Sequence, residues 1–230
     1  IPVSARGQRT GPLSPHVQLL LEHAPNKLHK MGKAQSQLLR ANYYSKVTLI
    51  DDCIGGIVQT LKDRGLLDNT WIVFSSDHGE MLGDHGLLAK KVFYEGAANV
   101  PCLFRPPNGQ GQGSTDALVN HLDIVATLID ICGAAPLQDS PSQSIAPLLG
   151  GESATSHRQA VLSELGLPPS AFVMVRTNEH KLSADAKTRE PIELYDLAED
   201  PAELHNLIER EDYAEIRQHL LTDVMNPMLS

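Results

Sequence analysis

The sequence is poor in cysteine, in positive charge and in long apolar runs. It holds three cysteines, Cys53, Cys102 and Cys132, whose spacing fits neither a zinc cluster nor a disulfide scaffold. We expect all three to be free and buried. A net charge of −9 gives no electrostatic footprint for nucleic acid, and the small basic cluster in 27–33 does not change that. No apolar run approaches the roughly 18 residues of a bilayer-spanning helix, and no signal peptide opens the sequence.

The most informative stretch is 75–80, Ser-Ser-Asp-His-Gly-Glu, which follows an apolar run directly. The run at 70–75 lacks polar alternation, which is typical of a central parallel strand covered on both faces. Open α/β sheets place their ligands where such strands end. Asp77 offers a hard oxygen and His78 a neutral nitrogen, a pair that suits Ca²⁺, Mn²⁺ or Mg²⁺ better than zinc. A simpler interpretation is that Asp77 caps a turn and His78 hydrogen-bonds the loop.

The residues that follow favour the metal interpretation. Segment 81–96 and segment 100–105, together with Ser-Asp-His-Gly at 76–79, closely resemble the type I sulfatases and the related phosphonate monoester hydrolases. Both groups belong to the alkaline phosphatase superfamily. In that family this motif ends a central strand and supplies two metal ligands, which map onto Asp77 and His78. The resemblance therefore implies that this chain carries half of a metal site.

The same resemblance identifies a lysine that contacts the ester. A family lysine thirteen residues beyond the aspartate contacts the sulfate or phosphate oxygens, and here that position is Lys90, with Lys91 as the alternative register. A fixed ammonium beside a metal stabilises the negative charge that develops on ester oxygens. The alternative is a solvated lysine pair on a surface loop. His85 is a further catalytic candidate that would donate a proton or hydrogen bond, although several family members have another residue there.

The resemblance implies an α/β fold. We expect part of an alkaline-phosphatase-like, mostly parallel sheet flanked by helices, plus a small carboxyl-terminal antiparallel sheet with helices. The Pro-, Gly- and Ser-rich linker at 135–156 marks the boundary. We therefore predict that 1–150 is the carboxyl-terminal part of the catalytic α/β domain and that 151–230 is a small α+β subdomain.

Helix patterns flank the two strands predicted at 70–75 and 101–105. From about residue 40, apolar residues recur at three and four positions, as a buried face requires, and Gly65 ends the helix. This face comprises Val47, Ile50, Ile54, Ile57, Val58 and Leu61. Within it, Asp51 and Asp52 point in different directions and are structural or solvated.

A second predicted helix has Asp123 as its cap and Gly133 at its end. Its sheet-facing residues are predicted to be Val125, Leu128, Ile129 and Cys132. We assign His121 and Asp123 to capping and packing rather than to metal binding.

The carboxyl-terminal region reads as a small sheet with helices. The predicted strands are 158–165, 171–177, 180–183 and 192–195, with a hairpin turn at Asn178 and Glu179. A helix is then predicted with Asp200 as N-cap, Pro201 at the first position and Glu203 in a capping box. A final helix is predicted at 213–225. A short helix is also predicted near the amino terminus, from Ser14 and Pro15 through Leu21.

Part of the family pattern is missing from this sequence. A type I sulfatase uses a cysteine in a C-x-P-x-R context, which is oxidised to formylglycine, and none of the three cysteines has that context. No apolar strand ending in metal-binding aspartates occurs before residue 40. Two ligands alone give only weak binding of a cation that prefers six or more oxygen ligands. We therefore expect the amino-terminal half of the same protein as the partner that supplies formylglycine and the remaining ligands, and we expect this chain alone to be inactive.

Three functions remain open. The first is a sulfuric ester hydrolase with a divalent metal, Ca²⁺ before Mn²⁺ or Mg²⁺, acting on a sulfated small molecule or glycan. The second is a phosphonate or phosphate ester hydrolase, since a metal, a lysine and a nucleophile serve either tetrahedral oxyanion. The third is a noncatalytic, sulfatase-like binding fragment. The family contains exported and cytoplasmic members, so localisation stays open, with the periplasm or secretion favoured. Oligomeric state is not determined.

Overall fold

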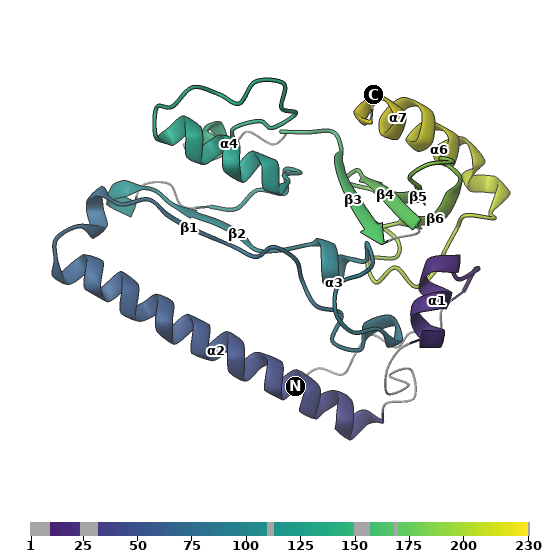
Figure 1. The fold of residues 1–230 in the computed structure, drawn as a ribbon, viewed down its shortest axis with the longest axis horizontal. Helices are drawn as coiled ribbons and strands as arrows, with labels where there is room; N and C mark the ends of the chain where they lie inside the picture. The colour runs from purple at the N-terminus through teal and green to yellow at the C-terminus, as the bar shows by residue number, and fades with distance from the viewer. Residues whose placement is uncertain (1–9, 24–31, 110–112, 150–156, 168–169, 230) are drawn as a thin grey trace. The chain divides into compact units, whose positions relative to one another are not determined.

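A computed structural model describes residues 10–23, 32–109, 113–149, 157–167 and 170–229 (Figure 1). The chain divides into two compact units whose segments interleave. Unit 1 comprises Ile1–Leu39, His78–Asn99 and Gln159–Ser230, and unit 2 comprises Arg40–Asp77 and Val100–Arg158. The predicted domains 1–150 and 151–230 stay a prediction, although the small sheet lies wholly within the second. The predicted linker at 135–156 and the basic stretch at 27–33 lie partly outside the described residues.

Helices and strands are mixed, and the predicted α/β fold class is confirmed. The α-helices are α1 Pro15–His23, α2 Lys33–Asp63, α3 Glu95–Ala98, α4 His121–Ile131, α5 Ala146–Leu149, α6 Ala214–His219 and α7 Asn226–Met228. The strands are β1 Ile72–Ser75, β2 Cys102–Arg105, β3 Val161–Leu167, β4 Ser170–Arg176, β5 His180–Asp185 and β6 Pro191–Asp196. A π-helical segment, Leu220–Met225, joins α6 to α7. None of the helices in the described ranges is long and apolar enough to cross a membrane.

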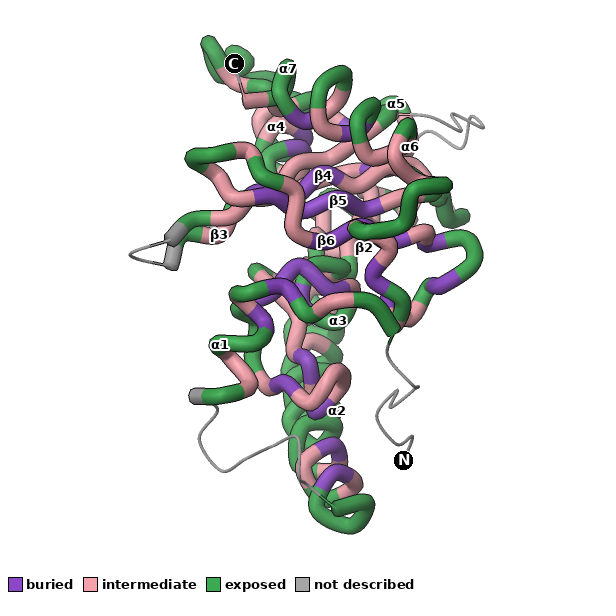
Figure 2. Tube along the Cα trace, turned by 90° about the vertical axis from the view of Figure 1, so that its right-hand side faces the viewer, coloured by how far each residue is buried: buried purple, intermediate pink, exposed green. Residues whose placement is uncertain are grey.

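The small antiparallel sheet is confirmed, with strand order β3-β4-β5-β6. The predicted hairpin turn is also confirmed, because the Thr177 amide donates to the His180 carbonyl at 2.9 Å across Asn178 and Glu179. Alternate residues of β4 and β5, together with one residue of β6, point into one core, as the period of a strand requires. That core comprises Val173, Val175, Leu182, Ala184 and Leu194, with Leu220 and Met225 of the terminal helical segment packed against them. Figure 2 shows buried stretches of β4, β5 and β6 in purple. The predicted final helix is thereby confirmed and covers one face of the sheet.

The predicted helix beginning at Asp200 is wrong, because this segment forms turns. Asp200 accepts a hydrogen bond from the amide of His205 at 2.7 Å, five residues ahead, rather than from the first turn of a helix. Glu203 has a φ of 55°, which an α-helix excludes. Its carboxylate is drawn into a buried ion cluster instead of reaching back to a cap. The capping pattern was present, but a tertiary contact outweighed it.

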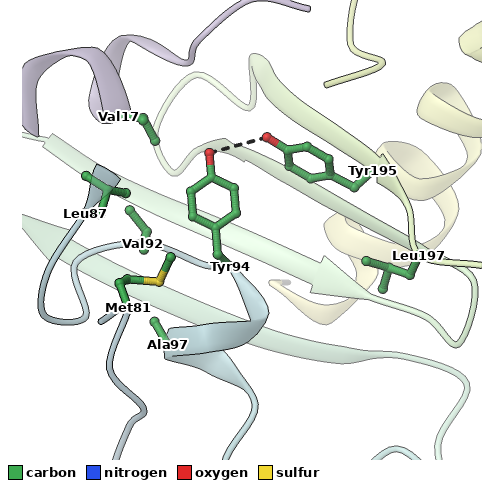
Figure 3. Packing of buried hydrophobic residues seen from close by; sticks show 8 residues of the cluster. All are labelled: Val17, Met81, Leu87, Val92, Tyr94, Ala97, Tyr195 and Leu197. Carbon is green, nitrogen blue, oxygen red and sulfur yellow. Dashed lines mark hydrogen bonds between the residues drawn. The ribbon is translucent and has the colours of Figure 1, made fainter. Parts of the chain in front are cut away.

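Segment 78–99 packs within unit 1 through its own apolar core (Figure 3). This core comprises Val17, Met81, Leu87, Val92, Tyr94, Ala97, Tyr195 and Leu197. The hydroxyls of Tyr94 and Tyr195 lie 3.4 Å apart, and Tyr94 donates to the carboxylate of Glu193 at 3.2 Å. Burial, together with the charge of Glu193, raises the pKa of Tyr195 far above its ordinary value. Segment 78–99 is therefore attached to β6 by aromatic packing and a buried hydrogen-bond network.

A buried ion cluster adds a second attachment of this segment to the sheet. The ammonium of Lys181, only 2% exposed, donates to the Phe93 carbonyl at 2.9 Å and to Glu95 and Glu203 at 2.6 Å each. Three partners match the three donors of an ammonium. The other Glu203 oxygen accepts the Glu95 amide at 2.7 Å, and Arg176 donates to Glu95 at 3.2 Å. The cluster therefore joins β4, β5 and the 203 turn to the start of α3.

The two carboxylates of this cluster differ in their charge balance. Burial would raise the pKa of Glu95, but Lys181 and Arg176 outweigh it and lower that pKa. Burial raises the pKa of Glu203, and the charge of Lys181 offsets only part of that effect. The difference follows from the number of cations, since Glu95 has two and is partly exposed, whereas Glu203 is almost fully buried beside one.

In unit 2, β1 and β2 form an antiparallel pair in which Ile72 faces Arg105 and Ser75 faces Cys102. Both strands were predicted. We expected β1 to be a parallel strand that is covered on both faces. Its pairing with β2 is antiparallel, and the exposed side chain of Phe74 shows that one face is not fully covered. An apolar run predicts that a strand can be buried, but it carries no information on the direction of the neighbouring strand.

Helix α2 ends as predicted but does not bury its predicted face. Gly65, at a φ of +64°, closes it in a Schellman motif, in which the Leu66 amide donates to the Leu61 carbonyl at 2.8 Å. Within the described structure Val47, Ile50 and Ile57 are 48%, 53% and 62% exposed, so the predicted burial is wrong for them (Figure 2). Helical periodicity identifies a face that can be buried, but not the element that covers it.

The cap of α4 is Asn120 rather than the predicted Asp123. The Asn120 side chain accepts the Asp123 amide at 3.2 Å, and the Asp123 carboxylate accepts the Asn120 amide at 3.1 Å, so Asp123 is the third residue of a capping box. The buried residues of the helix are Asp123 and Thr127, whereas Val125 and Leu128 are exposed. Asp123 therefore contributes to the cap of this helix, as predicted, but from the third helical position and not as the N-cap residue. The predicted burial of the apolar face is wrong for Val125 and Leu128.

Asp123 is buried because it forms an ion pair. Arg158 donates to both of its oxygens, at 2.8 Å and 2.5 Å, and the Gln143 amide donates at 2.8 Å. Burial alone would raise the pKa of Asp123, but the hydrogen bonds from Arg158, Gln143 and Asn120 and the guanidinium charge outweigh it and lower that pKa. These contacts join the start of α4 to the chain at 143 and 158.

The three cysteines are free, as predicted, but their predicted burial is wrong for two of them. Cys53 and Cys132 are exposed, and Cys102 on β2 is half-buried. Burial, together with the charge of Asp123, raises the pKa of Cys102. Cys102 is therefore mostly protonated near neutral pH.

Replacing Asp123 by Asn should destabilise unit 2. The change leaves the guanidinium of Arg158 buried without its charge partner, which costs about 3–5 kcal/mol. Urea unfolding followed by circular dichroism measures the loss, and Asp130→Asn, an exposed position on the same helix, is the matched control. Because the pKa of Asp123 is lowered by folding, its stabilisation is present above the ordinary carboxyl value near pH ~3.9 and is lost as the pH falls through the lowered value. An Asp123→Asn protein as stable as the control would contradict this assignment.

Replacing Lys181 by Met should destabilise unit 1 by about 3–5 kcal/mol, because two carboxylates then share a buried site without their ammonium. Adding Glu203→Gln should restore part of the loss, since the amide removes one of the two charges. The exposed Lys187→Met is the control. Thermal unfolding compares the four proteins, and an equal loss in the single and double variants would show that charge is not the cause.

Candidate active site

The predicted metal ligands follow β1. Asp77 is exposed and is the last residue of the first segment of unit 2. His78 is half-buried and is the first residue of the middle segment of unit 1. One peptide bond joins them, so their Cα atoms lie about 3.8 Å apart. In unit 2, the Ser76 carbonyl accepts a hydrogen bond from the Nε2 atom of His121 at 2.7 Å. His121 therefore supports the end of β1, in line with the packing role predicted for it.

The hydrogen bond of His78 selects its tautomer. Its Nδ1 atom lies 2.8 Å from the Gly79 carbonyl oxygen, which can only accept, so Nδ1 carries the proton. Nε2 is then the atom with the lone pair in the neutral ring. Metal-binding histidines use the same arrangement, in which one nitrogen donates to a carbonyl and the other faces the metal. The local geometry thus gives His78 the electronic state that a ligand needs.

Lys90 lies at the same nitrogen. Its ammonium contacts Nε2 of His78, so the structure brings together two of the predicted site residues. The Lys90 side chain is exposed, and its ammonium can therefore meet an incoming ester. Lys91, the alternative register, contributes its backbone carbonyl to the Nε2 atom of His16 at 2.6 Å. The contact with His78 distinguishes Lys90 from its neighbour.

The backbone around these two side chains is tightly bonded. The Gly79 amide donates to the Ala97 carbonyl at 2.8 Å, and a Cβ atom at Gly79 would collide with the Gly96 carbonyl. The Met81 amide donates to the Ala89 carbonyl at 3.0 Å. Only glycine therefore fits after His78, and Met81, three residues beyond His78, is bonded directly to Ala89, the residue before Lys90.

The ring of His85 lies against the apolar core of unit 1. Its ring stacks on Tyr94, with centroids 3.9 Å apart and planes inclined by 7°. Its φ of 55° belongs to a short helical turn, Asp84–Gly86. The stacking explains an imidazole at this position by packing, and its predicted catalytic role stays a prediction.

Sequence reasoning missed Glu80. Its Oε1 atom accepts the amides of Ala89 at 2.6 Å and Leu82 at 3.3 Å, so it closes the loop that carries Lys90. The sequence held one signal, an acid two residues beyond His78 in a loop with few other acceptors. The backbone conformation that brings Ala89 to this acid could not be read from the residues.

The donor types at 77 and 78 fit a divalent cation, although they do not complete its shell. A carboxylate oxygen and a neutral imidazole nitrogen suit Ca²⁺, Mn²⁺ or Mg²⁺. Across the described ranges, no group of three or more His, Cys, Asp and Glu side chains is arranged to hold a metal ion. Further oxygen donors are needed for a six-coordinate ion.

Comparison with known proteins identifies the family. The profile of the family Sulfatase matches residues 11–134, which is more than half of the 230 residues. A second profile, N-sulphoglucosamine sulphohydrolase, C-terminal, matches residues 83–228. Both matches include the segment that carries Lys90, and the second includes the small sheet.

Similar proteins are longer than this chain. It is 31% identical over 198 residues to a choline-sulfatase of Rhizobium meliloti (strain 1021), covering 85% of this chain and 38% of that protein. It is 33% identical over 194 residues to arylsulfatase K of Gallus gallus, covering 80% of this chain and 36% of that protein. The chain thus spans less than half the length of each of these relatives.

Solved structures agree with this result. The phosphonate monoester hydrolase of Agrobacterium radiobacter is 29% identical with a TM-score of 0.76, and the match covers 87% of this chain and 43% of that one. A protein solved in complex with its substrate D-glucosamine-2-N,6-O-disulfate is 26% identical with a TM-score of 0.76, and the match covers 93% and 45%. The chain therefore belongs to the sulfatase family, with an alkaline-phosphatase-like fold, and corresponds to the carboxyl-terminal part of the family pattern.

Proposed function

We propose that this chain is the carboxyl-terminal part of a sulfuric ester hydrolase. In this proposal Asp77 and His78 are metal ligands and Lys90 contacts the sulfate group. The contact of the Lys90 ammonium with Nε2 of His78 carries the proposal, because it brings an ester-binding cation and a metal-ligand atom to one place. Membership of the sulfatase family supports it.

Each residue has a defined chemical role. His78 holds its proton on Nδ1 through Gly79 and thereby directs the Nε2 lone pair to a cation. Lys90 places a positive charge where negative charge accumulates on the sulfate oxygens. A bound divalent ion, Ca²⁺ before Mn²⁺ or Mg²⁺, would neutralise ester oxygens and favour the ionised nucleophile. Glu80 and Gly79 keep the backbone between these groups in position.

We propose that the nucleophile and the remaining ligands belong to an amino-terminal part of the same protein. The chain spans 38% of the choline-sulfatase that it resembles, and none of Cys53, Cys102 and Cys132 has the C-x-P-x-R context of a formylglycine precursor. The exposed apolar positions of α2, among them Ile50 and Ile57, supply a surface on which further chain would pack. The 230 residues alone would then be inactive.

The proposed substrate is a sulfated glycan or sulfated small molecule. A structural neighbour was solved with a disulfated glucosamine, and a relative is a choline-sulfatase, so both kinds of organic group occur among similar proteins. Loops set such preferences, whereas the proposed metal and Lys90 act on the sulfate group itself.

Phosphonate ester hydrolysis is the second candidate, because a phosphonate monoester hydrolase matches 87% of this chain at a TM-score of 0.76. A metal and an ammonium stabilise either tetrahedral oxyanion. The candidate differs from the first in the central atom that is attacked and not in the residues that this chain contributes.

The full-length protein should hydrolyse an aryl sulfate faster than the matching aryl phosphonate. Release of 4-nitrophenol from 4-nitrophenyl sulfate and from a 4-nitrophenyl phosphonate measures both reactions under one set of conditions. The 230-residue chain is the control and should release none. Faster phosphonate turnover would establish the second candidate, and a full-length protein inactive on both would favour a noncatalytic binding fragment.

Replacing Lys90 by Ala should lower kcat/KM of the full-length protein about 100- to 1,000-fold, the usual loss when one group that stabilises transition-state charge is removed. Lys91→Ala is the matched control because it removes the same charge one position away, and it should retain most activity. Steady-state kinetics on 4-nitrophenyl sulfate compares the two. Equal losses, or a larger loss in Lys91→Ala, would contradict the assigned register.

A further inference from the structure

We propose that Glu80 is a positioning residue that sets the backbone at Ala89 and thereby places the Lys90 ammonium at His78. This inference rests on the proposed role of Lys90. Glu80 would act on the ester only through Lys90, whose backbone it positions at Ala89.

The carboxylate of Glu80 closes the loop at its two ends. It accepts the Ala89 amide at 2.6 Å, and the adjacent Met81 amide donates to the Ala89 carbonyl at 3.0 Å. Both polar groups of Ala89 are therefore bonded to the stretch that directly follows His78 and Gly79. Lys90 therefore follows a residue whose amide and carbonyl are both held by hydrogen bonds.

Ala89 needs such support because of its conformation. Its φ of +64° lies in the left-handed region, which is unfavourable for a residue with a Cβ atom. A non-glycine residue persists there only when surrounding contacts hold it. The charged acceptor supplies one of these contacts, and hydrogen bonds to charged groups are stronger than those between neutral groups.

The same loop contains a second bond to Glu80. The Leu82 amide donates to Oε1 at 3.3 Å, and Leu82 also has a positive φ, of 49°. One carboxylate oxygen thus spans the two strained positions that flank the turn 83–87. Without it, Ala89 can relax to a right-handed or extended conformation, and the Lys90 Cα–Cβ direction rotates away from His78.

The experiment measures kcat/KM on 4-nitrophenyl sulfate for the full-length protein with Glu80→Ala, Lys90→Ala and both. Glu80→Ala should lower kcat/KM about 10- to 100-fold, the usual loss for a residue that orients another. The double variant should match Lys90→Ala within about twofold, because a residue that acts only through Lys90 adds nothing once Lys90 is gone. Full additivity, or an unchanged Glu80→Ala enzyme, would overturn the inference.

Two further variants separate positioning from general stability. Glu80→Gln keeps an acceptor oxygen at the same length and should recover most of the activity. Asp185→Ala is the matched control, because the Asp185 carboxylate also accepts two backbone amides, of Lys187 and Thr188 at 2.8 Å each, in a turn of the small sheet. It should leave kcat/KM unchanged. If Glu80→Ala fails to fold, Glu80→Asp, which withdraws the carboxylate by one methylene, takes its place.

Hydrogen exchange of the Ala89 amide tests the contact without catalysis. In the full-length protein, exchange followed by mass spectrometry should accelerate at Ala89 in Glu80→Ala, while Glu80→Gln and Asp185→Ala keep its protection. An inactive wild-type protein would refute the proposed function, and the exchange result would still decide the contact. Unchanged protection in Glu80→Ala would overturn the inference whatever the activity.

Discussion

The buried ammonium of Lys181 is the contact on which the arrangement of unit 1 depends. It satisfies its three donors on the Phe93 carbonyl and on the carboxylates of Glu95 and Glu203, and so it joins β5 to the segment that carries Lys90. These contacts fix the position of the ammonium, because losing any one of them leaves a buried charge or carbonyl without its partner. The aromatic core around Tyr94 and Tyr195 adds apolar burial to the same junction. Lys90, for which we propose a contact with the sulfate group, thus belongs to a segment whose far end is held in the interior.

The opposite end of that segment is fixed by hydrogen bonds to the backbone. Gly79 packs against Gly96 and donates to Ala97, and Glu80 accepts the amide of Ala89. These contacts leave the Lys90 side chain exposed while its backbone is constrained. Such an arrangement reduces the conformational entropy lost when an ammonium engages an anion, and it leaves the long side chain free to adjust. The chemistry proposed for this chain therefore relies on a rigid backbone and an exposed cation.

Unit 2 is stabilised in another way. The carboxylate of Asp123 combines a helix-capping role with a bidentate ion pair to Arg158, so one buried acid organises α4 and the chain that follows it. Much of the apolar surface of α2 and α4 remains exposed, and β1 and β2 pair only with each other within the described residues. This distribution agrees with a chain that spans less than half the length of its sulfatase relatives.

The sequence by itself determined the family, the order of most elements, the small antiparallel sheet with its hairpin at Asn178 and Glu179, and the Gly65 end of α2. The family follows from the resemblance of the segments around Asp77 and Lys90 to known sulfatases. The other features follow from local rules of periodicity and turn composition, which act between residues close in the chain. The tertiary structure alone decided that Glu203 bonds Lys181 instead of capping a helix, that Ile50 and Ile57 are exposed, and that Glu80 accepts the amide of Ala89. Each of these outcomes depends on a contact between distant residues or on a backbone conformation, and burial, charge pairing and left-handed φ values have no local pattern that reveals them.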